Sequence, residues 1–292
     1  MKRPFVVVLL YLVSAVLCGA CASLTSKEEN ESPLRVIDVH THADFSGKQE
    51  ETSGILQTRE QFVRELKEAG VVGAVSHSPQ GGGSIDDSLK SEGVIHCFGV
   101  GAQVTPSKVE VGLKSGRYGC IKIYLGYVHR WAYDNEYRPL YRLAEKYDVP
   151  VVFHTGDPYS TKAKLKFTDP LTVDEVAVDF PKVRFVIAHC GNPWHASAAE
   201  VAFKNPNVYL ECSAFLIGDL TKYSPEVIDR HVVQPISWIF SYVDDPTKIM
   251  FGTDWPLVGI KPYLEVYKRA IPKADWPAVF HDNAARVFKI KR

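Results

Sequence analysis

The stretch Ile37-Asp38-Val39-His40-Thr41-His42 is typical of a buried β-strand that ends in two histidines. Alternate residues of a strand point to the same face, so His40 and His42 are expected to project together. Two imidazoles held side by side suit a borderline metal ion such as zinc. The stretch therefore predicts both a strand and the beginning of a metal site.

Three further apolar runs end in residues of metal-ligand type. They cover residues 151–154, 185–189 and 250–254 and end in His154, His189 and Asp254. Three histidines and one carboxylate can form a zinc shell, with a water at an open position. Four strand ends that each supply such a residue predict one shared site.

Strand patterns alternate with helical patterns along the chain. Most of the strand runs are continuously apolar, which suits parallel strands buried on both faces. Eight strands over roughly 250 residues predict an α/β fold, a single-domain (β/α)₈ TIM barrel. An open doubly wound sheet is the alternative, but no Gly-x-Gly-x-x-Gly turn follows the first strand. The strands are expected near residues 35–40, 71–76, 94–100, 119–125, 149–154, 183–189, 207–213 and 248–253.

Helix signals lie between these strand patterns. Residues 135–147 carry apolar side chains at helical spacing. Thr58-x-x-Gln61 and Thr172-x-x-Glu175 match the capping box, in which the threonine begins a helix. Both are therefore expected to precede a helix by one residue.

The N-terminus has the layout of a secretory signal peptide. Lys2 and Arg3 precede an apolar run, residues 5–16, and small residues follow. Ordinary cleavage after Ala22 competes with a lipoprotein-type signal in which Cys21 is lipidated. A polar tether, residues 22–33, favours the lipoprotein.

These patterns divide the chain into a signal peptide (1–21), a tether (22–33) and a barrel (34–292). We therefore expect an exported protein, either periplasmic or anchored to a membrane through Cys21. The chain has 34 basic and 34 acidic residues, which gives no electrostatic reason to expect nucleic acid as a partner. The sequence leaves open whether the protein forms a homo-oligomer.

Four cysteines follow Cys21, and all lie in or at the end of strand runs: Cys97, Cys120, Cys190 and Cys212. An exported protein can form disulfides, but free cysteine also packs as a small hydrophobe. We expect buried thiols.

Lys122 stands between two isoleucines in the fourth strand run, so it faces the opposite side from them. It is therefore expected to point into the barrel, where a buried lysine needs a partner or a lowered pKa. Asp38 shares a face with His40 and is expected to contact it from below.

The order of these motifs resembles the amidohydrolase superfamily. The motifs are Asp-Val-His-Thr-His in the first strand, His154 in the fifth, His-Cys-Gly in the sixth and Gly-Thr-Asp-Trp-Pro in the eighth. The resemblance is to the amidohydrolase-related (amidohydrolase 2) branch of TIM-barrel, metal-dependent hydrolases and decarboxylases, and it spans nearly all of the mature chain.

The resemblance implies a divalent metal, which we expect to be zinc, held by His40, His42, His154 and Asp254. His189 would then orient the substrate or shuttle protons, and Asp254 would take the proton of the metal-bound water. In two-metal relatives a carboxylated lysine bridges the ions, and Lys122 stands where that lysine would be. One ion is favoured here and two remain open.

The loop after the fourth strand holds aromatic rings and one cation, and Tyr127, Arg130 and Trp131 are candidates for binding a small-molecule substrate. We expect a hydrolase in which metal-bound hydroxide cleaves an amide, ester or lactone, with His189, Asp254 and Lys122 as catalytic residues. A non-oxidative decarboxylase or hydratase of a carboxylated ring is one alternative. A non-catalytic binding lipoprotein is another.

Overall fold

The apolar runs form eight parallel strands that pair in the order in which they occur along the chain. The computed structural model describes residues 33–290 apart from 83–84, so the signal peptide, Cys21 and all but the last residue of the tether lie outside the described residues. The strands are β1 (Val36–Thr41), β2 (Val71–His77), β3 (Val94–Val100), β4 (Cys120–Tyr124), β5 (Val151–His154), β6 (Phe185–Ile187), β7 (Val208–Glu211) and β8 (Ile249–Met250).

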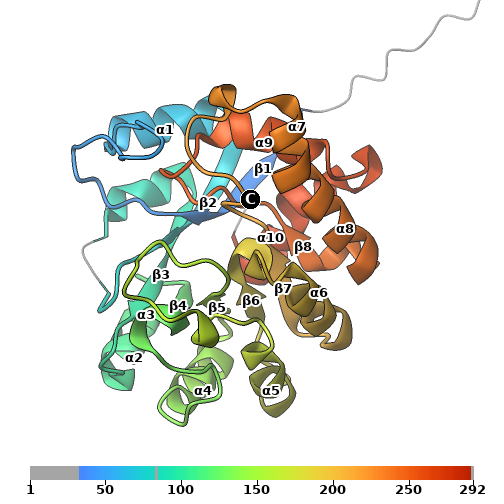
Figure 1. The fold of residues 1–292 in the computed structure, drawn as a ribbon. Coiled ribbons are helices and arrows are strands. Elements are labelled where there is room, and N and C mark those ends of the chain that lie inside the picture. Colours follow the sequence, from blue (N-terminus) through green and yellow to red (C-terminus); the bar gives the residue numbers. More distant parts are fainter. Residues whose placement is uncertain (1–32, 83–84, 291–292) are drawn as a thin grey trace, which may run out of the picture. The chain divides into compact units, whose positions relative to one another are not determined.

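Helices surround the sheet on the outside (Figure 1), and the TIM barrel predicted from the sequence is confirmed. The α-helices are α1 (Arg59–Glu68), α2 (Pro106–Lys114), α3 (Leu125–Val128), α4 (Arg138–Tyr147), α5 (Thr172–Asp179), α6 (His195–Lys204), α7 (Pro225–Ile228), α8 (Gln234–Val243), α9 (Ile260–Lys268) and α10 (Asn283–Phe288). The 3₁₀ and π turns are η1 (Asp87–Glu92), η2 (Leu165–Phe167), η3 (Ala188–Gly191), η4 (Leu220–Lys222), η5 (Asp229–Val233), η6 (Pro246–Lys248), η7 (Lys273–Asp275) and η8 (Ala278–Asp282).

β1 meets the segment that follows β8, and this contact brings the two edges of the barrel together. The backbone N–H of Val39 donates to the carbonyl of Phe251 at 3.0 Å. The Asp38 carboxylate accepts from the backbone N–H and the hydroxyl of Thr253, and from the backbone N–H of His40. Burial raises the pKa of Asp38 to about 7, although these hydrogen bonds oppose the rise. Asp38 therefore ties β1 to the segment after β8, directly below the predicted metal ligands.

The barrel interior is a separate apolar cluster from the larger core between strands and helices. Inward residues of the strands, such as Val39 and Val152, pack there with Val287 and Phe288 of α10. The C-terminal helix thus fills one end of the barrel with apolar side chains. The ligand-bearing carboxyl ends of the strands are left for the site.

Two disulfides replace the buried thiols that we expected, and this expectation was wrong. Cys97 and Cys120 are register partners on β3 and β4, with Cα atoms 4.3 Å apart. Cys190 and Cys212 follow β6 and β7, with Cα atoms 4.7 Å apart. Neighbouring strands place both pairs within bonding reach, and sequence alone does not give this register.

The helix start predicted at Thr58 is confirmed, because the Thr58 hydroxyl accepts from the backbone N–H of Gln61 at the start of α1, but the Gln61 side chain donates to Glu65 and does not complete the capping box. The second was wrong. Thr172 is itself the first residue of α5, and its hydroxyl accepts from the backbone N–H of Ala132. The Thr172 hydroxyl therefore bonds to the loop after β4 and does not cap α5.

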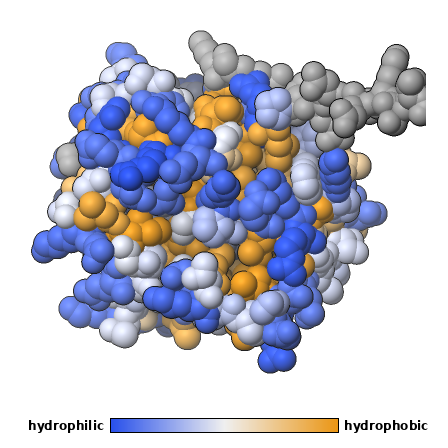
Figure 2. Space-filling view, turned by 90° about the horizontal axis from the view of Figure 1, so that it is seen from above, coloured by the Kyte–Doolittle hydropathy of each residue, from blue (hydrophilic) through white to orange (hydrophobic). Residues whose placement is uncertain are grey.

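Seen from the side at the top of Figure 1, the surface is a mixture of hydrophilic and apolar residues (Figure 2). Within the described part of the chain, no helix has the length and apolar character needed to span a membrane.

Candidate metal centre and active site

His40 points from the end of β1 toward Asp254, and the opposite side of its ring is anchored. Its Nδ1 lies 2.5 Å from Glu211 Oε1, and its Nε2 lies 3.5 Å from Asp254 Oδ1. A carboxylate accepts and does not donate, so the proton resides on Nδ1. Burial, followed by the charge of Lys122, lowers the pKa of His40 well below its usual value. The ring is therefore neutral, with a lone pair on Nε2.

His42 is held in the same way by a different partner. Its Nδ1 donates to the backbone carbonyl of His77 at 3.1 Å, and its Nε2 lies 3.1 Å from Asp254 Oδ1. Strand alternation brings His40 and His42 to one face, with ring centroids 5.4 Å apart.

The donor set fits a metal ion. Each Nδ1 proton is used in a hydrogen bond to Glu211 or to the His77 carbonyl, so the two Nε2 lone pairs and an Asp254 oxygen face one another. A cation between these three atoms would remove the repulsion between their lone pairs. Ligand atoms around a tetrahedral zinc with bonds of about 2.0–2.1 Å lie about 3.3 Å apart. The observed separations of 3.1 and 3.5 Å agree with that spacing. His40, His42 and Asp254 therefore form a candidate metal centre.

Asp254 is fixed by backbone geometry as well as by its neighbours. It adopts a left-handed conformation with φ 70°, and its N–H donates to the carbonyl of His40 at 2.8 Å. Burial alone would raise the pKa of Asp254, but nearby positive charge, including that of Lys122, outweighs burial and holds this pKa below its ordinary value. The carboxylate is ionised at neutral pH, as a metal ligand must be.

Glu211, the last residue of β7, was missed by the sequence analysis. It is fully buried, and its carboxylate accepts from His40 Nδ1 and from the backbone N–H groups of His189 and Ser213. A second group of ligand-type residues contains His40, His189 and Glu211. Because these bonds occupy both oxygens of Glu211, we assign it the role of orienting His40.

His154 and His189 face each other across the strand ends of β5 and β6. His189 Nε2 lies 3.1 Å from His154 Nδ1, and His189 Nδ1 lies 2.8 Å from the Ser213 hydroxyl. His154 Nε2 is buried without a hydrogen-bond partner. If His154 Nε2 carries a lone pair, the proton of this ring is on Nδ1 and is donated to His189 Nε2. His189 then carries its own proton on Nδ1 and donates it to the Ser213 hydroxyl. Burial lowers the pKa of His189 to about 4, so it is neutral.

Lys122 points into the barrel, as predicted. It is fully buried, and its Nζ lies 3.5 Å from His40 Nε2. Burial lowers the pKa of its ammonium group, while the charges of Glu211 and Asp254 oppose the shift. Burial likewise raises the pKa of Glu211, while the charge of Lys122 opposes that shift, so each group favours the charged form of the other beneath the candidate metal centre.

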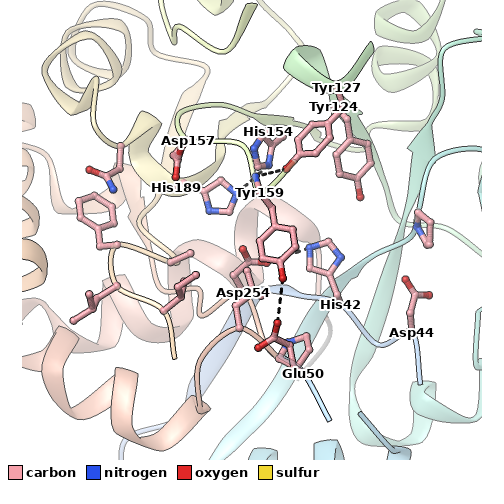
Figure 3. Close-up of a pocket in the computed structure, with 18 of the residues that line it drawn as sticks. His42, Asp44, Glu50, Tyr124, Tyr127, His154, Asp157, Tyr159, His189 and Asp254 are labelled. Atoms are coloured by element: carbon pink, nitrogen blue, oxygen red, sulfur yellow. Dashed lines mark hydrogen bonds and ion pairs between the residues drawn. The ribbon is translucent and has the colours of Figure 1, made fainter. Parts of the chain in front are cut away.

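The centre opens into a pocket of about 700 Å³. Tyr127 lines it, and Figure 3 shows this ring close to His154. The Tyr127 oxygen accepts from the backbone N–H of Tyr159 at 2.8 Å. Burial raises the pKa of Tyr127 to about 12, so its own proton is retained and can be donated to a ligand.

The other two predicted substrate residues lie elsewhere. Arg130 pairs with Glu136 at 2.8 Å and donates to the carbonyl of Ala102. Trp131 stacks on Tyr133 with ring centroids 5.9 Å apart. Neither residue lines the pocket. The structure therefore brings Tyr127 into the pocket and leaves Arg130 and Trp131 outside it.

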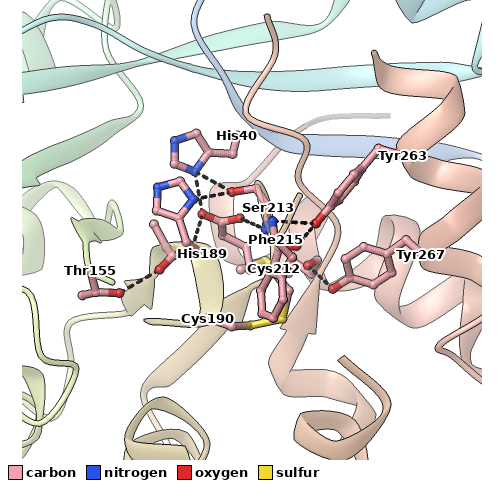
Figure 4. Close-up of a disulfide and its surroundings, with 12 residues drawn as sticks. His40, Thr155, His189, Cys190, Cys212, Ser213, Phe215, Tyr263 and Tyr267 are labelled. Atoms are coloured by element: carbon pink, nitrogen blue, oxygen red, sulfur yellow. Dashed lines mark hydrogen bonds and ion pairs between the residues drawn. A yellow bond between two sulfur atoms is a disulfide. The ribbon is translucent and has the colours of Figure 1, made fainter. Parts of the chain in front are cut away.

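One disulfide borders the centre (Figure 4). Cys190 follows His189, Cys212 follows Glu211, and their bond joins the two chain segments that carry these side chains. His189 and Cys190 both have positive φ, at 57° and 43°. The disulfide thus clamps a strained backbone turn that presents His189.

The amidohydrolase family profile matches residues 55–290. The chain belongs to the amidohydrolase family. No curated protein matches the sequence. The match of this chain to the amidohydrolase family confirms the resemblance seen in the sequence motifs.

Solved structures share the fold at low identity. An uncharacterised TIM-barrel protein from Bordetella bronchiseptica has a TM-score of 0.64 and 19% identity, covering 88% of this chain and 99% of that chain. A probable 2-pyrone-4,6-dicarboxylic acid hydrolase from Acinetobacter baumannii, solved with citric acid, has a TM-score of 0.61 and 17% identity, covering 87% and 99%. A 5-carboxyvanillate decarboxylase from Novosphingobium aromaticivorans, complexed with manganese and a nitrobenzoic acid ligand, has a TM-score of 0.61 and 12% identity, covering 87% and 95%. Together, the family and its neighbours support a metal-dependent hydrolase or decarboxylase.

Proposed function

We propose that this protein is a metal-dependent hydrolase of a small molecule with an ester, lactone or amide carbonyl. One observation carries the proposal. His40 Nε2, His42 Nε2 and Asp254 Oδ1 converge at a pocket that His42 and Asp254 line, and the Nδ1 atom of each imidazole is hydrogen-bonded to an orienting partner. The ion favoured by two imidazoles and one carboxylate is zinc.

His40, His42 and Asp254 would hold the ion, and His154 Nε2 supplies a further lone pair from the pocket wall. When bound, a divalent ion polarises a carbonyl and lowers the pKa of water to roughly 7. Asp254, ionised and facing the pocket, accepts the proton of the attacking water and returns it to the leaving group.

Tyr127 donates its hydroxyl proton in a hydrogen bond to the oxygen of the substrate carbonyl, where negative charge develops. His189, with both ring nitrogens engaged by His154 and Ser213, keeps the His154 ring in place. Lys122 and Glu211 balance each other below the ligands.

The proposal is tested with purified protein, elemental analysis and a panel of esters, lactones and amides. We expect about one equivalent of metal, loss of turnover on chelation and recovery when Zn²⁺ is returned. About two equivalents, with a carbamate on Lys122, would support the bridged site instead. Full turnover by metal-free protein would sink the proposal.

Decarboxylation is the alternative, and two structural neighbours act on carboxylated compounds by name. A carboxylated substrate is usually held by arginine or lysine. Among the described residues that line the pocket there is none. Release of CO₂ from aromatic acids would nevertheless establish the decarboxylase, and a complete lack of turnover with metal present would favour a binding protein.

A further inference from the structure

The pocket above the candidate metal centre has an acidic rim. The rim consists of Asp44, Glu50, Asp157 and Tyr159, which come from the loops after β1 and β5. Figure 3 shows Glu50 on the side of the pocket opposite His154 and His189. Of the described residues that line the pocket, none is a lysine or an arginine. The negative charges of the rim are therefore not neutralised from within the pocket.

A divalent ion does not remove this imbalance. Asp254 and the three rim acids supply four negative charges to the lining, and the ion would supply two positive charges. The hydrogen bonds that run from His154 Nδ1 through His189 to the Ser213 hydroxyl give each of these rings a single proton, so the two rings add no charge. A carboxylated substrate would therefore enter a pocket that is still negative.

The cationic residues near the pocket in sequence do not line it. Arg130 is paired with Glu136. Lys162, Lys164 and Lys166, in the loop after β5, are exposed and do not line the pocket. These side chains act on the pocket only through solvent, where salt screens them.

Glu50 is the best-defined group of the rim. It is 7% exposed, and its Oε2 accepts from the backbone N–H groups of Thr52 and Ser53. Its Oε1 faces the Tyr159 hydroxyl at 3.4 Å. A fixed carboxylate beside an aromatic ring is the arrangement that proteins use to bind ammonium and guanidinium groups.

The opposite side of the pocket is also built to receive a ligand. His154 is 8% exposed, and its Nε2 is buried, unpartnered and part of the pocket lining. Apolar side chains, among them Phe215 and Leu257, complete the wall. The pocket thus combines a reacting side, an apolar wall and an acidic rim.

We propose that the substrate is a cation, in which an ammonium or guanidinium nitrogen is joined by an apolar segment to the reacting carbonyl. Glu50 binds the cationic nitrogen, and the Tyr159 ring covers it. The assignment of the reacting carbonyl rests on the proposed hydrolase function, whereas the charge preference rests on the rim.

Three 4-nitrophenyl esters test the proposal, with acyl chains of equal length ending in trimethylammonium, tert-butyl or carboxylate. Trimethylammonium and tert-butyl have the same shape, so their ratio isolates the charge. We expect kcat/KM to fall about tenfold from ammonium to tert-butyl, as for an interaction of about 1.4 kcal/mol, and further for carboxylate. A carboxylate ester cleaved as well as the ammonium ester overturns the proposal.

Glu50→Gln removes the charge and keeps an oxygen that can accept from the backbone. We expect the ammonium to tert-butyl ratio to fall toward one. Glu51→Gln is the matched control, because Glu51 is exposed in the same loop and does not line the pocket, and it should leave the ratio unchanged. In the unaltered protein, raising salt from about 0.05 to 0.5 M should also narrow the ratio. An unchanged ratio in both measurements overturns the proposal.

Binding of the three matching ketones, which cannot be hydrolysed, separates this inference from the hydrolase function. Tightest binding of the ammonium ketone without cleavage of any ester supports the cation site and counts against the hydrolase. Cleavage of the esters without a charge preference in either series supports the hydrolase and overturns the cation site.

Discussion

Glu211 and Glu50 are both buried glutamates of one active-site region, but they are built into it in different ways. Glu211 ends a strand, and its bonds go to His40, His189 and Ser213. Glu50 lies in a loop, is bonded by the backbone of that loop, and faces a tyrosine from another loop. We call the first region the floor (His40, Lys122, Glu211 and Ser213) and contrast it with the rim.

The difference indicates that the floor and the rim have different roles. Floor side chains are fixed by strand register, so each one constrains the position of another. Rim side chains are placed by loops, which vary without disturbing the barrel. We therefore expect floor substitutions to reduce metal binding and turnover together, and rim substitutions to change which substrate is used.

The largest effect is expected for His40→Ala/His42→Ala. This double variant removes two of the three converging ligand atoms, so bound metal and turnover should be lost together, with a rate loss on the order of a thousandfold. Elemental analysis and steady-state kinetics measure both. His231→Ala, an exposed histidine of η5, is the control and should change neither. Retained activity in the double variant would contradict the site.

Glu211→Gln tests whether the floor acts by orienting its ligands. The substitution keeps the shape but weakens the acceptor for His40 Nδ1, so metal affinity should fall about 10–100-fold. Competition with a chromogenic chelator measures this affinity. Glu226→Gln, on exposed α7, serves as the control. An unchanged affinity would mean that Glu211 has only a structural role.

Removal of each disulfide in turn tests which of them supports the floor. They close loops of 22 and 23 residues, so loss of either by paired Cys→Ala substitution should cost about 3 kcal/mol of unfolding free energy. Only loss of Cys190–Cys212 should slow turnover, by about tenfold, because it holds His189. Urea denaturation and kinetics separate the two effects. Equal loss of activity in both pairs would refute the distinction.

Arg130→Ala should have the smallest effect. Its guanidinium is bound by Glu136 and by the Ala102 carbonyl, so we expect less than a twofold change in KM. The surface ion pair contributes about 0–1 kcal/mol to stability. A large rise in KM for a carboxylated substrate would show that Arg130 swings into the pocket, and would weaken the contrast between floor and rim.

The strands were predictable because their runs are continuously apolar, and the direction of Lys122 was predictable because alternate residues of a strand face opposite sides. The convergence of His40, His42 and Asp254 was predictable because a barrel brings all carboxyl strand ends to one face. The same rule, applied to the run that ends in Glu211, would have found that residue too. Glu211 was not selected as a site residue because a charged glutamate at the end of a strand is usually exposed to solvent.

Other features depend on information that the sequence does not display. The disulfides follow from the pairing register of neighbouring strands, and the register appears only once the barrel closes. The places of Glu50 and Arg130 follow from loop paths, which have no periodic signal. His77 orients His42 through its backbone carbonyl, and a pattern of side chains cannot predict a role of the backbone.

The helix that fills one end of the barrel has a consequence for the order of folding. Its apolar residues pack against β1, so the barrel interior is covered at that end only when residues 284–290 are docked. The first and last parts of the described chain must therefore meet before the apolar interior is shielded from water. A chain that lacked this helix would keep every candidate metal ligand but would expose the apolar interior at that end of the barrel.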